Sequence, residues 1–161
     1  MKILILYFTM GGRTRKTAKA IATALTNHEV SYFPIEITGK FIEKIKLLDK
    51  FEKKDFSEIE KELSTIDSSG YDLIIFGMPT YGNFPPKAFD ELLARMGDLS
   101  GKKAIVFNTA RFTGDKCLDY MKEKVEKTNA KVIDQRKFRK LFWIGTKDAI
   151  EFGKKINEIK L

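Results

Sequence analysis

The chain has 161 residues and is 43% hydrophobic, which is enough for one domain with a single core and excludes a disordered chain. Its net charge of +8 comes from Lys and Arg spread along the whole length, without a dense basic tract, so we expect no nucleic-acid binding. No apolar run approaches the ~20 residues that cross a bilayer, and no signal-peptide pattern is present. The one cysteine, Cys117, cannot form an internal disulfide. We therefore expect a single cytoplasmic domain over residues 1–161, with no membrane partner.

The first 25 residues predict a strand, a turn and a helix. The apolar run Ile3–Tyr7 ends in the turn Thr9–Thr14, which is rich in glycine and hydroxyl groups, and the helical pattern Arg13–Leu25 follows at once. A helix that begins directly after a strand and a turn of small residues aims several backbone N–H groups at one point, together with the positive end of its dipole. The turn is therefore expected to bind a phosphate group.

Apolar runs and helical patterns alternate along the rest of the chain. Continuous apolar strands are typical of sheets buried on both faces, so this alternation predicts an α/β fold whose mostly parallel sheet lies between two layers of helices. Further strands are expected at Val30–Pro34, Leu73–Met78, Ala104–Phe107 and Val132–Phe142, and further helices at Lys87–Met96, Asp115–Thr128 and Lys147–Ile159.

The segment between the second and third strands holds two amphipathic patterns, one more than a simple crossover needs. Phe56–Ile66 has helical spacing, and Asp55 with Glu58 predicts a capping box at its start. Before it, Phe41–Phe51 is a second amphipathic pattern, with lysines on its other face. This extra helix has two interpretations: a cover for the edge of the sheet, or a contact with a partner or with a second copy of the chain.

Ligands of open parallel sheets bind beyond the carboxyl ends of the strands, so the turns at these ends are the candidate sites. The turns after the first, third and fourth strands contain glycine, hydroxyls or amides, and the last two also contain aromatic residues. They suit a phosphate at one point and a flat ring at another. A Walker A loop ending at Lys16-Thr17 would need glycine at Met10 and Arg15, so that motif is excluded. We expect no metal site and no catalytic nucleophile–base pair.

These residues resemble the flavodoxin family, in the same order along nearly the whole chain. Tyr7–Thr14 is similar to the family's phosphate-binding loop, Asp72–Tyr81 to its third strand and first flavin loop, and Lys103–Asp115 to its fourth strand and second flavin loop. Ala149–Lys155 resembles the final helix. The resemblance implies a flavodoxin-like three-layer sandwich with a five-stranded parallel sheet in the order 2-1-3-4-5, the helix over Phe41–Phe51 being additional. It also implies non-covalently bound FMN.

Carried over residue by residue, the resemblance places three sets of residues around FMN, with Tyr81 and Phe112 as the candidates for stacking on the ring. The phosphate set is Thr9, Met10, Gly11, Gly12, Arg13 and Thr14. The set on one side of the ring is Pro79, Thr80, Tyr81, Gly82, Asn83 and Phe84. The set on the other side is Asn108, Thr109, Arg111, Phe112, Gly114 and Asp115.

The phosphate loop departs from the family at two positions. The family usually has threonine where Gly11 stands and asparagine where Arg13 stands. Loss of the threonine hydroxyl removes one phosphate hydrogen bond, which is worth about 1.5–3 kcal/mol when charge-assisted. Arg13 either replaces it with two parallel hydrogen bonds or points into solvent.

The resemblance implies an electron-transfer protein that shuttles electrons between redox partners. Positive charge at Arg111 and Lys87 predicts a less negative potential for the couple that yields the anionic reduced flavin. The basic balance of the whole chain predicts a redox partner with an acidic docking face. Two alternatives remain open. One is an FMN-dependent NAD(P)H:quinone-type oxidoreductase, and the other is a domain of this fold that has lost FMN. Under each of these three interpretations we expect a monomer or a homodimer.

Overall fold

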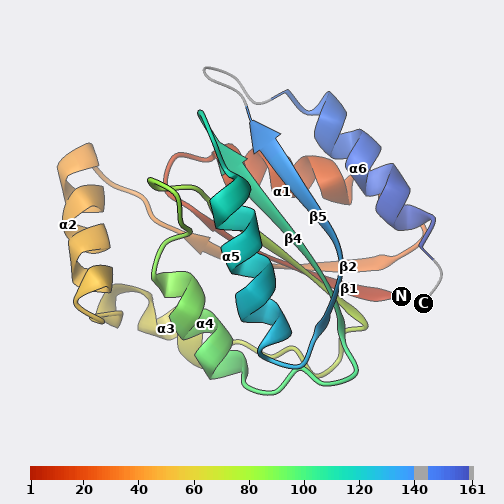
Figure 1. The fold of residues 1–161 in the computed structure, drawn as a ribbon, viewed down its shortest axis with the longest axis horizontal. Coiled ribbons are helices and arrows are strands. Elements are labelled where there is room, and N and C mark those ends of the chain that lie inside the picture. The colour runs from red at the N-terminus through yellow and green to blue at the C-terminus, as the bar shows by residue number, and fades with distance from the viewer. Residues whose placement is uncertain (140–144, 160–161) are drawn as a thin grey trace.

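A computed structural model describes residues 1–139 and 145–159 (Figure 1). Five strands form one sheet in the order β2-β1-β3-β4-β5, with every neighbouring pair parallel, so the predicted order is confirmed. The end predicted for the last strand, at Phe142, lies outside the described residues. The strands are β1 (Lys2–Thr9), β2 (Glu29–Glu36), β3 (Leu73–Pro79), β4 (Lys103–Ala110) and β5 (Lys131–Arg139).

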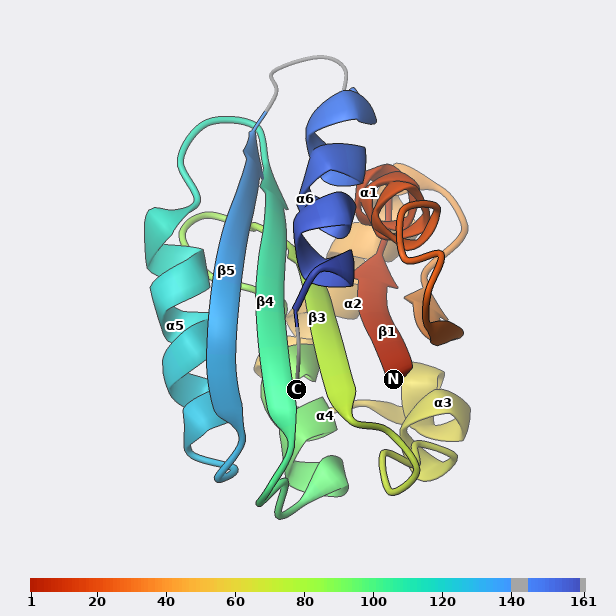
Figure 2. The same cartoon turned by 90° about the vertical axis from the view of Figure 1, so that its right-hand side faces the viewer.

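Helices cover both faces of the sheet, as Figure 2 shows, and this is the predicted three-layer sandwich. The first and last helices pack against each other on one face, and the others lie on the opposite face. The helices are α1 (Arg13–Ala22), α2 (Phe41–Glu52), α3 (Glu60–Ser64), α4 (Ala88–Met96), α5 (Asp115–Glu126) and α6 (Lys147–Asn157), with a 3₁₀ turn, η1 (Ser57–Ile59), before α3.

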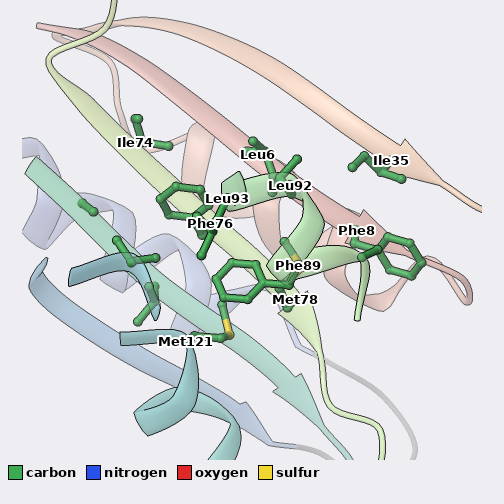
Figure 3. Close-up of a cluster of buried hydrophobic side chains, with 14 of the residues drawn as sticks. Leu6, Phe8, Ile35, Ile74, Phe76, Met78, Phe89, Leu92, Leu93 and Met121 are labelled. Atoms are coloured by element: carbon green, nitrogen blue, oxygen red, sulfur yellow. The ribbon is translucent and has the colours of Figure 1, made fainter. Parts of the chain in front are cut away.

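The strands are apolar throughout because each face of the sheet carries its own core. Along β1, Leu6 and Phe8 belong to the core shared with α4 and α5, whereas Ile5 and Tyr7 belong to the core shared with α1 and α6. Successive side chains of a strand point to opposite faces, so both sets must be apolar. Figure 3 shows the first core, where side chains from β1, β3, α4 and α5 interlock. The two cores hold the carboxyl ends of the strands in fixed positions.

The additional helix α2 packs against the sheet with only its second half. Leu47 and Phe51 are buried, and the ring centroid of Phe51 lies 6.1 Å from that of Phe8 on β1. The residues Phe41, Ile42 and Ile45 of the first half remain exposed. One half of α2 therefore covers the sheet, in agreement with one of its two interpretations, and the other half is left for a different role.

The second helical pattern of this segment is shorter than expected and begins differently. Phe56–Ile66 forms η1 and the short α3 rather than one continuous helix. Asp55 accepts hydrogen bonds from the backbone and the hydroxyl of Ser57, so the predicted capping box with Glu58 is wrong. Glu58 instead forms an ion pair with Lys50 of α2, across the turn that separates α2 from η1.

Candidate functional site

A cavity of about 490 Å³ lies at the carboxyl end of the sheet, where the loops after β1, β3 and β4 meet. Figure 1 shows these loops gathered at one end of the molecule, with the first turn of α2 turned toward the same end. The residues that line the cavity come from all four segments: Thr9, Met10, Gly11, Arg13 and Thr14; Pro79, Thr80, Tyr81 and Gly82; Thr109, Arg111, Phe112 and Thr113; and Phe41.

One end of the cavity is the start of α1. Gly12 precedes the helix with φ of 78°, a left-handed conformation that glycine adopts without strain. Its N–H donates to Thr9 Oγ1 at 3.0 Å, which closes the turn. The first turn of α1, Arg13–Lys16, is basic and contains no acidic residue, so nothing in the helix itself offsets the positive end of its dipole. This end of the cavity suits an anion.

A chain of polar contacts connects the start of α1 to β2. Tyr7 Oη donates to Glu36 Oε1 at 2.8 Å, and Arg15 Nη1 donates to Glu36 Oε2 at 2.8 Å. Burial by itself would raise the pKa of Glu36, but the hydrogen bonds from Tyr7 and Arg15 and the Arg15 charge outweigh it and lower that pKa. Glu36 is therefore ionised at neutral pH and holds the first turn of α1 against the neighbouring strand.

The other end of the cavity is formed by the two loops that contain aromatic residues. Tyr81 and Phe84 exchange backbone hydrogen bonds of 2.9 and 3.2 Å around a tight turn, in which Gly82 has φ of 63°. The turn presents Tyr81 to the cavity, and burial raises the pKa of its phenol to about 12, so it is neutral at physiological pH. Phe112 approaches from the loop after β4 and is 69% exposed.

Asn108 links these two loops through hydrogen bonds beneath the cavity, on the side of the core. Its side chain is completely buried, and Nδ2 donates to Thr80 Oγ1 at 3.0 Å and to the Gly114 carbonyl at 2.7 Å. Its Oδ1 has no hydrogen-bond partner among the described residues. Asn108 thus fixes the spacing of the loops without itself lining the cavity.

Several residues carried over from the family lie outside the cavity lining. The ring of Phe84 packs edge-on against Tyr120 at 5.4 Å, and Asp115 forms an ion pair with Lys137. Any contact between these residues and a flavin stays a prediction. The predicted residues that do not line the cavity are Gly12, Asn83, Phe84, Asn108, Gly114 and Asp115.

Sequence reasoning missed two residues that line the cavity, Thr113 and Phe41. Thr113 lies between predicted residues of the same loop, and its hydroxyl was a usable signal. Phe41 belongs to the additional helix, and its sequence pattern carries no indication that it reaches the loops of β1, β3 and β4.

A second cavity, of about 480 Å³, lies between the end of β2 and α2, and the charge of its lining differs from that of the first. The second cavity is lined by both acidic and basic side chains, among them the paired Lys50 and Glu58, and by no aromatic residue. In contrast, the charged side chains that line the first cavity are Arg13 and Arg111, so its interior is positive. The first cavity is the candidate site because it combines positive charge with aromatic walls.

Two further properties concern residues 1–139 and 145–159 only. No helix among them is both long enough and apolar enough to cross a bilayer. No three His, Cys, Asp or Glu side chains among them come together as a metal ion would require.

Comparison with solved structures identifies the fold. Flavodoxin 1 from Bacillus cereus superposes with a TM-score of 0.63 at 22% identity, covering 99% of this chain and 100% of its own. A flavodoxin from the domain Archaea gives 0.61 at 18% identity, with 98% and 97% covered. A flavoprotein from Lactobacillus acidophilus, solved in complex with FMN, gives 0.61 at 21% identity, with 84% and 92% covered. No protein-family model and no curated protein matches the sequence. The chain has the flavodoxin-like fold.

Proposed function

We propose that this chain binds FMN in the cavity at the carboxyl end of its sheet and carries electrons between redox partners. The observation that carries the proposal is that one cavity contains both an anion site and aromatic walls. FMN has the matching parts, a phosphate at one end and a flat ring at the other. The flavodoxins that share the fold, and the flavoprotein solved with FMN, support the same assignment.

The residues present fit this cofactor. The hydroxyls of Thr9 and Thr14, the N–H groups at the start of α1 and the Arg13 guanidinium are phosphate donors. A Cβ added at Gly11 would find nothing within 4 Å, so the loop keeps the space that a threonine side chain occupies in the family. Bound FMN supplies one- and two-electron chemistry, while the chain binds it, orients it and sets the charge around it.

The composition of the cavity favours a carrier over an enzyme. Among the described residues that line it, none is a His, Cys, Asp, Glu or Lys. Tyr81 is the titratable group besides the two arginines, and its raised pKa keeps it protonated. A reductase that must move protons to an organic substrate is helped by a general acid with a pKa near the operating pH, and these side chains offer none.

The charge at the cavity also supports the choice of partner. Arg13 and Arg111 lie at the cavity. Lys40, just before α2, and Lys44 on its first turn add two positive charges beside it, against one negative charge from Glu43. A redox protein with an acidic docking face would be attracted to this end of the molecule. We place the exchange in the cytoplasm, where the buried thiol of Cys117 stays reduced.

The deciding experiment is a titration of the purified chain with FMN, followed by flavin absorption and fluorescence, with riboflavin as the control that lacks phosphate. Binding at one FMN per chain, much tighter than riboflavin, is expected. A chain that takes up no FMN would refute the proposal and favour a domain that has lost the cofactor.

Rapid NADH or NADPH oxidation with a quinone by the loaded protein would favour the reductase. Electron transfer to an acidic partner should slow as salt is added.

A further inference from the structure

We infer that Phe41, from the additional helix α2, forms part of the wall of the FMN site, and that Lys44 holds it there. The inference rests on the proposed function and goes beyond it, because it gives the exposed half of α2 a role in cofactor binding. It concerns a residue that lies outside the three loops to which the family resemblance assigned the flavin.

The position of Phe41 is the first observation. Its side chain lines the same cavity as Tyr81 and Phe112 although it comes from a different part of the chain. The three rings are 76%, 38% and 69% exposed for Phe41, Tyr81 and Phe112 respectively. Exposed aromatic side chains gathered around one cavity mark a binding site, since a flat ligand can cover them all.

The attachment of α2 to the phosphate loop is the second observation. The Ile37 N–H donates to the Thr9 carbonyl at 2.9 Å, so pairing with β1 continues past the end of β2. Further along, Lys44 Nζ donates to the Met10 carbonyl inside the phosphate loop. The segment that carries Phe41 is thus hydrogen-bonded to the phosphate loop at two points, by Ile37 before the helix and by Lys44 on its first turn.

The rest of α2 is also fixed in place. Glu43 Oε2 accepts from the Lys40 N–H at 2.7 Å, which caps the start of the helix. Leu47 and Phe51 bury the second half against the sheet. Phe41 is therefore carried on an ordered element before any ligand arrives, and a wall that is already in place costs little entropy when the cofactor binds.

A third aromatic wall has a defined benefit in this chain. Gly11 removes one hydroxyl from the phosphate loop, and contact with Phe41 adds apolar burial that offsets the missing hydrogen bond. It also removes water from the cofactor. The wall should act chiefly on the rate at which FMN leaves, because a covered ligand must uncover before it dissociates.

The test compares FMN affinity and dissociation rate for Phe41→Ala with those for Ile42→Ala. Ile42 is the next residue of the same helix, is 66% exposed and does not line the cavity, so it is an exposed apolar control on the same helical turn. Phe41→Ala should weaken FMN binding about tenfold and speed dissociation by a similar factor. Ile42→Ala should leave both unchanged, and Phe41→Tyr should restore them. Circular dichroism and thermal unfolding of each variant without FMN verify that α2 still folds.

The role of Lys44 is tested by combining variants. If Lys44 positions Phe41, Lys44→Met should weaken binding, and Phe41→Ala should cost less in the Lys44→Met background than alone, since contacts that act together are not additive. If Phe41→Ala reduces FMN affinity by the same factor in both backgrounds, Lys44 does not position Phe41.

Failure of the inference is distinguishable from failure of the proposed function. If the natural chain binds FMN and Phe41→Ala binds it equally well, Phe41 is no wall of the site and the proposed function still holds. If the natural chain binds no FMN, both fall together.

Discussion

The hydroxyl oxygens of Thr14 and Thr109 lie 2.9 Å apart, in a buried contact between the first turn of α1 and the end of β4. β3 lies between β1 and β4 in the sheet, so this hydrogen bond spans the switch point at which the ligand is expected. It joins the loop that we assign to the phosphate to the strand that carries the second ring loop. The spacing of the two ends of the cavity is therefore fixed by the chain itself.

Removing either hydroxyl should lower the stability of the fold, but the two variants should differ in how much they weaken FMN binding. Thr14→Val and Thr109→Val both break the contact and leave one buried hydroxyl unpaired, so each should lower the free energy of unfolding by about 1–3 kcal/mol. Only Thr14→Val also removes a hydroxyl from the phosphate loop. We expect it to weaken FMN binding more than Thr109→Val does, measured by urea unfolding and FMN titration. Equal affinities for the two variants would contradict a phosphate contact by Thr14.

Restoring the threonine that the family carries should strengthen the phosphate site. Gly11 lies outside the left-handed region, and an added Cβ meets open space, so Gly11→Thr is accommodated without strain. One new hydroxyl donor should tighten FMN binding about tenfold, but not riboflavin binding. Gly12→Thr adds the same side chain to the same loop at a residue whose φ of 78° penalises it by about 1–2 kcal/mol, so it should not tighten FMN binding. A Gly11→Thr variant with unchanged FMN affinity would show that the phosphate lies elsewhere.

Positive charge at the cavity should raise the potential at which the bound flavin becomes a reduced anion. Arg111→Ala removes one charge from the lining, so the potential of that couple should fall by about 20–40 mV at low salt, and by less at high salt. Lys131→Ala, at the opposite end of the sheet, serves as the control with the same change in net charge. A redox titration in which both variants shift the potential equally would indicate a net-charge effect and no local one.

The contact between Glu36 and Arg15 should make stability depend on pH in a defined direction. The pKa of Glu36 is lower in the folded chain than its ordinary 4.5. The paired carboxylate therefore stabilises the fold above pH 4.5, and this contribution is lost as the pH falls through the lower folded value. Glu36→Gln should lower the free energy of unfolding by about 0.5–1 kcal/mol at pH 7 and by less at pH 3, measured by urea unfolding.

The control for this prediction is Glu126→Gln, which removes an exposed partner of Lys122 at 4.0 Å. Its effect should be close to zero at both pH values. A cost of Glu36→Gln that stays the same at pH 7 and pH 3 would exclude the carboxylate charge as its source.

Local patterns predicted the strands and helices, but the bounds differ in opposite directions: the helices α1, α5 and α6 end two or three residues earlier than expected, whereas the first four strands run longer than hydropathy alone indicates. β1 was expected at Ile3–Tyr7 and runs from Lys2 to Thr9. Thr9 still pairs with Glu36 of β2 in register, because pairing uses backbone groups whatever the side chain is. The polar ends of the strands are therefore invisible to a search for apolar runs, although they carry the residues of the site.

The amino-acid sequence by itself determined the order of the elements and the chemistry of the turns, since apolar periodicity, glycine and hydroxyl residues act through neighbours along the chain. Only the tertiary structure decided which side chains reach the cavity. Phe41 lines it because α2 is held by Lys44 at the phosphate loop and by Phe51 against β1, whereas Asn108 lies beneath it in a buried link between two loops. Such placements depend on contacts between residues far apart in sequence, and no local pattern encodes them.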